Sequence, residues 1–245
     1  MSIKVVIIAA LEREVAPLVK GWRVLDNSHS GVYRTFQHGD TTVVCSGIGF
    51  GPAQKCAESA ISILTPQVVV SAGLAGALVP EMKVGQVLVP ATIVNSRTGA
   101  RINTGHGSGT LVSAAGIAGP EGKRLLAHQH SGLAVDMEAA AVAEVAEGHK
   151  IGFTAVKAIS DDADFPVPDL ERFVDDEGRF LTGKFVAHVG LHPRLWGTVR
   201  QFALNSAHAS QELCRVLRNL IESGKWQVGP KSVRPAATIE GIRVP

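Results

Sequence analysis

Residues 133–164 have the sequence LAVDMEAAAVAEVAEGHKIGFTAVKAISDDAD, in which two apolar runs each end in carboxylates. The first run is followed by Asp136 and Glu138 and then by an alanine-rich stretch that favours a helix. The second run, 153–159, is rich in β-branched residues and predicts a buried strand that leads into Asp161. Open α/β sheets bind ligands at the carboxyl ends of their strands, so these carboxylates are candidate site residues. Each one alone could equally complement a helix dipole or belong to a loop.

Composition narrows the class of protein. The 245 residues are 45% hydrophobic and 19% charged, which predicts a soluble globular protein with one α/β domain. The formal net charge of +2 is too close to neutral to predict binding to nucleic acid or to a membrane surface. Three cysteines without paired spacing predict a reducing compartment, here the cytoplasm, and argue against a metal site. No apolar stretch reaches the length of a membrane span.

The periodicity of apolar residues predicts the order of the secondary-structure elements. We expect a strand at 3–10, a helix at 12–20, a hairpin over 31–46 that turns at 39–40, a helix at 53–64, strands at 67–71, within 84–94 and at 111–113, a mobile loop at 97–109, and helices at 121–130 and 195–223. This alternation predicts a single domain over 1–224, with a twisted, mixed and mostly parallel central sheet flanked by helices, followed by a tail over 225–245. The last helix is expected to bury a stripe that includes Leu204 and Leu213, and Trp196 and Phe202 are expected to serve packing rather than substrate contact.

Two glycine-rich segments are candidate binding loops. The first, 47–51, precedes a helix and could bind a dinucleotide, but Pro52 stands where the fingerprint requires its last glycine. We therefore expect no nicotinamide or flavin cofactor. The second begins with Gly73 and Leu74 in the sequence GLAG, and small residues there let the backbone approach a ligand, although a tight turn would need them too. His106, in the expected mobile loop, is predicted to be solvated rather than catalytic.

Four motifs together resemble the family of nucleoside phosphorylases and nucleosidases that includes methylthioadenosine/S-adenosylhomocysteine nucleosidase. They are AALEREV at 9–15, SGIG at 46–49, VDMEA at 135–139 and ISDDAD at 159–164. The resemblance implies a twisted central sheet flanked by helices and an assembly of two or more copies. It also implies a small purine nucleoside as substrate and no cofactor.

The resemblance also implies roles for single residues. Asp161 corresponds to the acid that protonates N7 of the departing purine, and Glu14 to the base that activates water. Glu138 corresponds to the residue that binds the ribose hydroxyls, and Met137 packs on the sugar. Ile117 falls in the segment whose backbone meets the base.

This sequence departs from the nucleosidase pattern at two places. Leu74 stands where a serine is common near the nucleophile, and the base-stacking phenylalanine expected near 115–117 is missing. The GLAG segment and a short middle region look more like the hopanoid-associated phosphorylase branch, whose substrates carry a bulky apolar group on the 5′ carbon. Gly73, Leu74 and Ser160 are therefore included with the candidate substrate-binding residues.

The chemistry of bond cleavage assigns different requirements to the two carboxylates. Breaking a ribose–purine bond needs an acid at the base and negative charge near the sugar. Asp161 must be protonated when substrate is bound, and burial beside Asp162 and Asp164 would favour that state. Glu138, at a helix N-terminus, is expected to stay ionised and accept hydroxyl hydrogen bonds.

The nucleophile decides between hydrolysis and phosphorolysis. An ionised Glu14 suits water, whereas a phosphate about 4 Å away would be repelled by roughly 4 kcal/mol at an effective dielectric of about 20. A phosphorylase would need donors such as Arg13, Arg97, Arg101 or the amides of 47–51. We therefore predict hydrolysis of a 5′-substituted adenosine to adenine and the free sugar. Phosphorolysis of a purine nucleoside with a bulky apolar 5′ group, with phosphate as second substrate, and a non-catalytic nucleoside-binding or storage protein are the alternatives.

Overall fold

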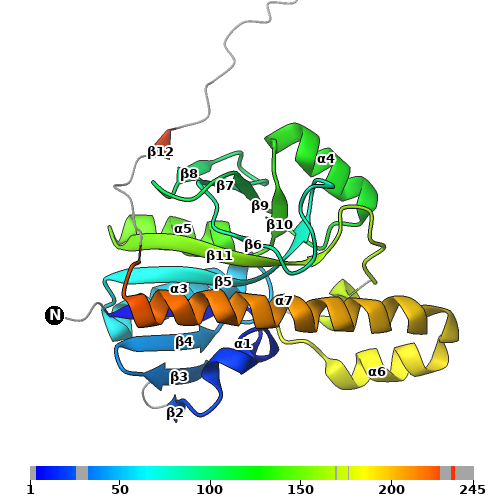
Figure 1. Ribbon diagram of the computed structural model, residues 1–245, viewed down its shortest axis with the longest axis horizontal. Helices are drawn as coiled ribbons and strands as arrows, with labels where there is room; N and C mark the ends of the chain where they lie inside the picture. Colours follow the sequence, from blue (N-terminus) through cyan, green and yellow to red (C-terminus); the bar gives the residue numbers. More distant parts are fainter. Residues whose placement is uncertain (1–3, 26–32, 169, 176, 227–232, 235–245) are drawn as a thin grey trace, which may run out of the picture.

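One large mixed sheet forms the centre of the molecule (Figure 1). The computed structural model describes residues 4–25, 33–168, 170–175, 177–226 and 233–234. The strands are β1 Val5–Ala9, β2 Arg23–Leu25, β3 Arg34–His38, β4 Thr41–Cys45, β5 Val68–Ala77, β6 Val87–Leu88, β7 Thr92–Asn95, β8 Arg101–Asn103, β9 Thr110–Ser113, β10 Ala134–Asp136, β11 Gly152–Asp161 and β12 Val233–Arg234. Their order is β12-β8-β7-β9-β10-β5-β1-β4-β3-β2, and β11 pairs with β5 and β6. The predicted mixed α/β fold is confirmed.

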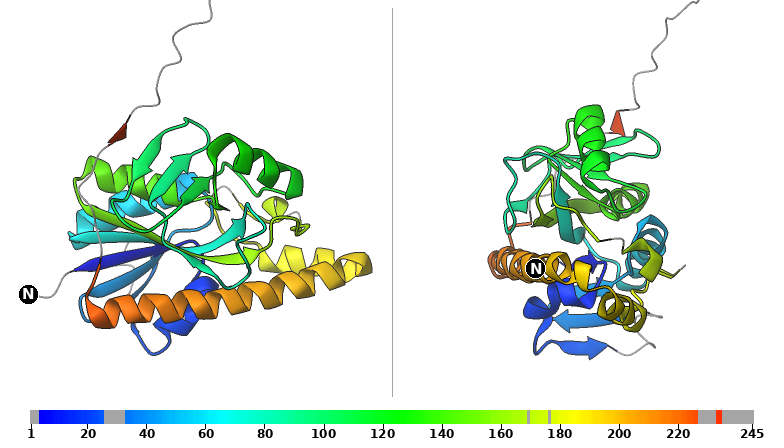
Figure 2. Two further views of the ribbon diagram at one scale, coloured as in Figure 1. Left: turned by 45° about the horizontal axis from the view of Figure 1, so that its top comes forward. Right: turned by 90° about the vertical axis from the view of Figure 1, so that its right-hand side faces the viewer.

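Helices cover both faces of the sheet. They are α1 Glu12–Val19, α3 Phe50–Leu64, α4 Pro120–His130, α5 Ala139–Gly148, α6 Thr182–Leu191 and α7 Trp196–Ser223, with 3-10 turns η1 Glu171–Phe173 and η2 Pro193–Leu195. The apolar faces of α3 and α5 form one core layer with the sheet, and those of α1 and α7 form the other (Figure 2). Because α5 is alanine-rich and almost wholly buried, it packs closely against the strands.

The structure corrects several of the expected boundaries. The GLAG segment at 73–76 is not a loop, because β5 continues through it and pairs with β11 along its length. The expected mobile loop at 97–109 contains β8, which pairs with β7. Helix α6 was not predicted at all. In α7, Leu213 is buried as expected, but Leu204 and Trp196 are exposed because this end of the helix extends past the sheet (Figure 1).

The described part of the tail contacts the domain at two places. Trp226 is buried in the core layer formed by α1 and α7, and β12 pairs antiparallel with β8. The other tail residues, 227–232 and 235–245, lie outside the described residues, so a separate tail over 225–245 stays a prediction. Among the described residues, the structure has no helix with the length and hydrophobicity that crossing a membrane requires.

Candidate active site

The carboxyl ends of β10 and β11 lie beside the last residues of β5. In the parallel β5–β11 pairing, Asp161 lies opposite Gly76, after a register shift at the end of the ladder. In the antiparallel β5–β10 pairing, Gly76 also lies opposite Val135, the residue before Asp136. The two carboxylate-bearing strand ends are therefore brought together around one glycine, although β10 runs antiparallel to β5 and β11 runs parallel to it.

A cavity of about 150 Å³ opens at this edge. It is lined by seven of the eight predicted site residues: Glu14, Leu74, Ile117, Met137, Glu138, Ser160 and Asp161. Gly73, the eighth, lies behind the wall, where a Cβ atom would come 2.9 Å from Oε2 of Glu14. A second hollow of about 440 Å³ shares Ile48, Gly116, Ile117 and Met137 with the cavity. The combined volume of the two lies within the range of a usual small-molecule site, roughly 300 to 1,000 Å³.

Glu14 has a buried carboxyl group at the cavity. Its Oε2 atom is buried and has no hydrogen-bond partner among the described residues. Burial, and then the negative charge of Glu138, raise the pKa of Glu14 from 4.5 to about 7, while Lys157 and Arg13 act in the opposite direction. Glu14 therefore changes protonation close to neutral pH.

Lys157 lies at the centre of an acidic cluster. Its Nζ is 2.8 Å from Oδ2 of Asp136, and both side chains are buried. Burial opposes its charge, but Asp136, Glu138 and Glu14 together raise the pKa of Lys157 above its ordinary value. One ammonium group thus faces three carboxyl groups, which leaves this part of the site short of positive charge.

Asp136 and Glu138 have different hydrogen-bond partners within this cluster. Asp136 accepts hydrogen bonds from the Ser113 hydroxyl at 2.6 Å and from the Ala139 amide at 2.8 Å, which fixes the start of α5. Glu138 Oε1 accepts from the Gly49 amide at 2.8 Å, and burial raises the pKa of Glu138 despite Lys157. Burial therefore opposes the expected ionised state of Glu138, which Lys157 and the amides of Gly49 and Met137 favour.

Asp161 is held in an ion pair. Lys123 Nζ donates to Oδ2 of Asp161 and, at 2.7 Å, to the backbone carbonyl of Asp162. The Ser160 hydroxyl donates to Oδ1 of Asp161 at 2.6 Å. The side chains of Asp162 and Asp164 are exposed, so the charge that faces buried Asp161 is a lysine rather than two further carboxylates.

Comparison with known proteins identifies the family. The family model described as Phosphorylase superfamily matches residues 4–129 and 97–189 of this sequence, which together span most of the chain. The chain belongs to the phosphorylase superfamily. This membership confirms the predicted relation to nucleoside phosphorylases and nucleosidases and the prediction of an enzyme of that class. It also supports cleavage of an N-glycosidic bond as the type of reaction.

Solved structures of this superfamily share the fold at low sequence identity. The apo 5′-methylthioadenosine nucleosidase of Arabidopsis thaliana gives a TM-score of 0.71 at 20% identity, over 93% of this chain and 98% of that one. The S-adenosylhomocysteine nucleosidase of Streptococcus pyogenes, solved with 5-methylthiotubericidin, gives 0.68 at 19%, over 91% and 97%. The futalosine hydrolase of Helicobacter pylori gives 0.68 at 18%, over 91% and 99%. At such identities the likeness establishes the fold alone. An assembly of two or more copies and a cytoplasmic location stay predictions.

Sequence reasoning missed two buried lysines at the site, Lys123 and Lys157. Lys157 interrupts the apolar strand run FTAVKAI, and a lysine in a buried strand requires a charged partner, so a signal for it was present. Lys123 had no comparable signal, since it lies in a polar helix whose sequence predicts solvent exposure. Phe202 was expected to serve packing. It lines the cavity and stacks on Phe165, with ring centroids 6.1 Å apart.

Three backbone amides of the glycine segment 47–51 donate to acceptors within the protein. The amides of Gly47, Ile48 and Gly49 donate to Ala10 O, to Gly178 O and to Glu138 Oε1. Of the three arginines considered as phosphate donors, Arg13 lines the cavity, whereas Arg101 contacts the His130 carbonyl at the surface. The described residues contain no cluster of three or more His, Cys, Asp or Glu side chains suited to a metal ion.

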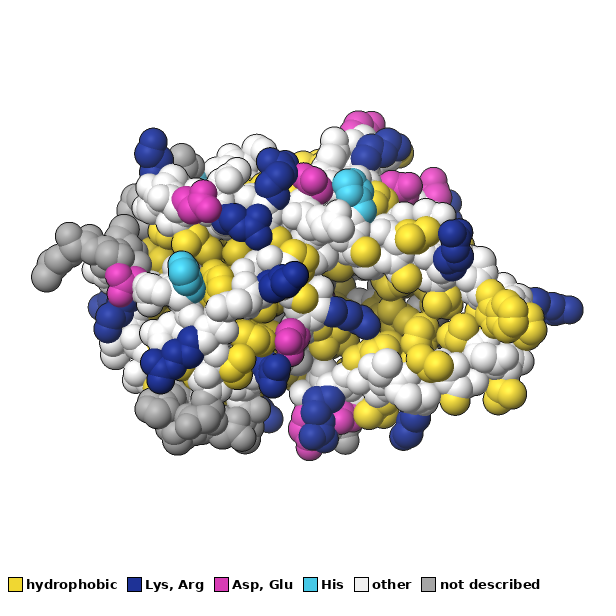
Figure 3. Space-filling model, turned by 60° about the horizontal axis from the view of Figure 1, so that its bottom comes forward, with side chains coloured by type: hydrophobic (Ala, Val, Ile, Leu, Met, Phe, Trp, Pro, Cys, Tyr) yellow, Lys and Arg dark blue, Asp and Glu magenta, His cyan; other side chains and the backbone are white. Residues whose placement is uncertain are grey.

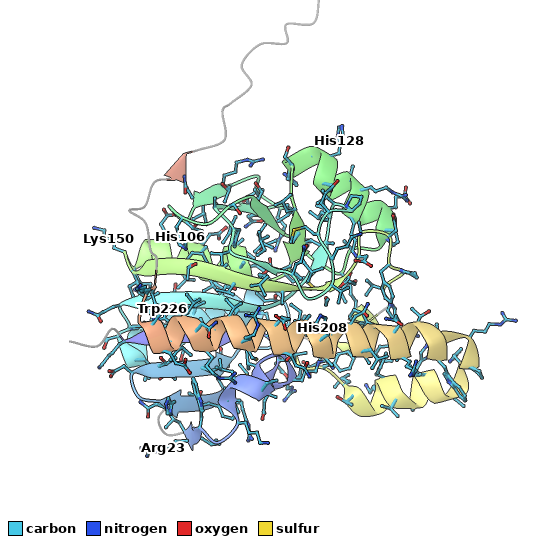
Figure 4. The ribbon with its side chains drawn as sticks, viewed as in Figure 1. Arg23, His106, His128, Lys150, His208 and Trp226 are labelled. Carbon is cyan, nitrogen blue, oxygen red and sulfur yellow. The ribbon has the colours of Figure 1, made fainter. Side chains whose placement is uncertain are left out.

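His106 lies away from this site. Its Nε2 is 2.7 Å from the Thr154 hydroxyl, near the start of β11, whereas the cavity lies at the end of that strand (Figure 4). The ring is half-buried, and its Nδ1 is 2.8 Å from the Thr104 carbonyl. We therefore assign His106 a structural role in holding the segment before β9 against the sheet.

Proposed function

We propose that this protein hydrolyses the N-glycosidic bond of a 5′-substituted adenosine, releasing adenine and the free sugar, and that the 5′ substituent is apolar. The observation that carries the proposal is Glu14, whose unpartnered Oε2 atom lies at a cavity shared with Glu138 and Asp161. A general base works best when its pKa is close to the working pH. The pKa of about 7 at Glu14 meets this requirement for taking a proton from water.

The acidic cluster supports the sugar half of the reaction. As the bond between C1′ and the purine nitrogen breaks, positive charge develops on the ribose, and carboxylates held nearby stabilise it. Glu138 has unused acceptor positions for a ribose hydroxyl beyond its bonds to the Gly49 and Met137 amides. Water adds its oxygen to C1′ and gives its proton to Glu14.

The ion pair supports the purine half of the reaction. The electron pair of the broken bond stays with the purine, which then needs a proton at N7. Lys123 and Asp161 together hold one transferable proton. In the proposed step it moves from Lys123 Nζ to Asp161 and from Asp161 to N7, and Lys123 regains a proton from solvent.

Three features favour water over phosphate as the nucleophile. Glu14, Asp136 and Glu138 surround a single ammonium group, that of Lys157, which already pairs with Asp136 and is not free to bind an incoming phosphate. The amides of Gly47 to Gly49 are occupied by protein acceptors. An ionised Glu14 about 4 Å from a phosphate would repel it by roughly 4 kcal/mol at an effective dielectric of about 20. Of the three arginines considered as phosphate donors, Arg13 alone lines the cavity.

The apolar wall supports the choice of substituent. Leu74, Val167, Leu170 and Phe202 all line the cavity. Burying one methylene group contributes about 0.8 kcal/mol, so each carbon added to a 5′ group should tighten binding until the wall is filled. A plain 5′-hydroxyl would leave this apolar surface uncovered, whereas a thioalkyl group would cover it.

The decisive experiment follows release of free base from methylthioadenosine, S-adenosylhomocysteine, adenosine and inosine, with and without phosphate. We expect base to appear without phosphate, fastest from methylthioadenosine. Glu14→Gln and Asp161→Asn should each lower kcat by about 100- to 10,000-fold, as is typical for loss of a general base or acid. Glu12→Gln is the matched control, since Glu12 is an exposed neighbour on α1 that pairs with Arg34.

Other outcomes would redirect the proposal. Base release that requires phosphate, with ribose 1-phosphate accumulating, would replace hydrolysis by the phosphorolysis alternative. Folded protein that binds these nucleosides without releasing base would favour the non-catalytic alternative. Glu14→Gln with native turnover would remove Glu14 from the mechanism and leave only the fold-level assignment.

A further inference from the structure

Helices α6 and α7 form a helical hairpin, residues 182–204, that extends beyond the sheet (Figures 1 and 2). None of the residues of α6 is buried, although its sequence TGKFVAHVGL is mostly apolar. Its inner side contacts the domain through Phe185, whose ring lies 5.3 Å from that of Phe173. The outer side of the hairpin has no partner among the described residues that would explain its composition.

Large exposed hydrophobic side chains are concentrated on this hairpin. Val186 is 61% exposed, Leu191 80%, Trp196 55% and Leu204 50%. Elsewhere in the part of the chain that the structure describes, the large exposed hydrophobics Val24, Ile63 and Leu125 lie singly on β2, α3 and α4. Figure 3 shows hydrophobic side chains gathered over the end of the molecule that carries α6 and the start of α7. A contiguous apolar patch of this kind marks an interaction surface.

The charge on the hairpin has one sign. Between Thr182 and Gln211 the sequence contains no Asp or Glu. Lys184, Arg194 and Arg200 lie in the same stretch, and all three side chains are exposed. Helices that bind at the surface of a bilayer combine an apolar face with Lys and Arg, which are attracted to anionic lipids. The near-neutral net charge of the whole chain conceals this local excess.

A second copy of the chain is a poorer occupant for the same reason. A two-fold symmetric contact places a surface patch against itself. Here that contact would bring basic side chains against basic side chains, with no carboxylate in the patch to pair with them. An anionic bilayer supplies the missing negative charge and also an apolar phase for the exposed leucines and tryptophan.

We propose that the helical hairpin docks this protein onto an anionic phospholipid bilayer. Leu191 and Trp196, near the turn between the helices, enter the interfacial region, where tryptophan is favoured. Lys184, Arg194 and Arg200 face the lipid phosphates. The proposal concerns the surface and stands whether or not the proposed reaction is correct.

Docking would have a consequence for the site, which does rest on the proposed function. Phe202 lies on the same helix as Trp196 and lines the cavity. A docked hairpin would hold the cavity close to the lipid phase. A substrate with an apolar 5′ group could then reach the site without crossing water.

The test is co-sedimentation of the full chain with phosphatidylcholine vesicles, with and without phosphatidylglycerol. We expect binding to the anionic vesicles that weakens as salt rises, because salt screens surface charge. Replacing Leu191 and Trp196 by Ser should reduce the binding constant at least about tenfold, since each buries a large apolar side chain. The matched control replaces Ile63 and Leu125 by Ser, because these two residues are also more than half exposed but lie on α3 and α4.

Charge is tested separately. Arg200→Glu should weaken binding by roughly fivefold or more, whereas Arg23→Glu, at an exposed arginine on β2, should not. Equal binding to neutral and anionic vesicles, or no binding to either, would overturn the proposal. The proposal would also be overturned if the unaltered chain formed a larger assembly without binding vesicles and the folded Leu191→Ser/Trp196→Ser variant did not assemble. The hairpin would then be an interface between copies of the chain. Circular dichroism of each variant establishes folding.

Discussion

Lys123 is the residue whose removal would reveal most about proton transfer. Lys123 Nζ donates to Oδ2 of Asp161 in a buried ion pair, so in the proposed step it supplies the proton that Asp161 passes to the purine. We expect Lys123→Met to lower kcat at neutral pH by about 100-fold, because Asp161 then loses this proton donor.

The control for this prediction is Arg124→Met, the neighbouring exposed position on α4. Breaking a buried ion pair costs roughly 3–5 kcal/mol, so lost stability must be separated from lost chemistry. Native kcat in a folded Lys123→Met variant that unfolds at a lower urea concentration would make Lys123 a structural partner of Asp161 only.

Single residues also show where sequence reasoning succeeds and where it stops. The motifs predicted that Glu14, Glu138 and Asp161 converge, and all three line the cavity. The shared-edge argument holds for the parallel strands β1 and β11 but not for β10, which runs antiparallel to β5. The motifs did not predict the counter-charges. Lys123 lies on α4, and the placement of this helix beside the end of β11 brings the lysine to Asp161.

At the scale of elements, β5 is the strand on which the site depends. A Cβ atom at Gly76 would lie 2.9 Å from Oδ2 of Asp161 and 3.1 Å from Cε of Lys123. Gly76→Ala should therefore displace the ion pair and lower kcat by about 100-fold, since a shift of about 1 Å in a catalytic group costs that much. Gly148→Ala, at an exposed glycine of α5 with open space around it, is the control.

The result would contradict this account if Gly76→Ala kept native kcat with an unchanged fold. Its stability should fall by about 1–3 kcal/mol, the usual cost of overpacking, and urea unfolding measures that loss. A variant that loses stability without losing kcat would show that the ion pair can move without harm to the reaction.

The same strand explains why element prediction failed there. Glycine and alanine are poor strand formers, so GLAG predicted a loop. In the structure, β5 pairs with β11 along its length and with β1 and β10 over parts of it, and backbone pairing overrides the weak local preference. Helix α6 was missed for a related reason, because Gly183 and Gly190 weaken the helical pattern in a segment that the core does not bury.

At the scale of the whole molecule, the acidic cluster links activity to stability. Burial raises the pKa of Glu14 from 4.5 to about 7, and it also raises that of Glu138. A carboxyl group whose pKa is raised by folding stabilises the native state while it is protonated, and that contribution is lost as pH rises through the folded value. The free energy of unfolding should therefore fall between about pH 4.5 and pH 7.

Glu14→Gln isolates this effect, because glutamine resembles the protonated carboxyl group and does not titrate. The free energy of unfolding of this variant, from urea titrations at pH 5 and pH 8, should fall less than that of the unaltered chain. One pKa unit corresponds to about 1.4 kcal/mol, so the two falls should differ by up to roughly 3 kcal/mol.

His130, whose pKa is lowered, contributes in the opposite direction as pH rises, but it is present in both proteins and cancels in the comparison. Glu12→Gln, at an exposed glutamate, should behave like the unaltered chain. Equal pH dependence in all three proteins would mean that Glu14 is already ionised in the free protein. Its role as a base poised near neutral pH would then be lost, while the fold and the hairpin would be unaffected.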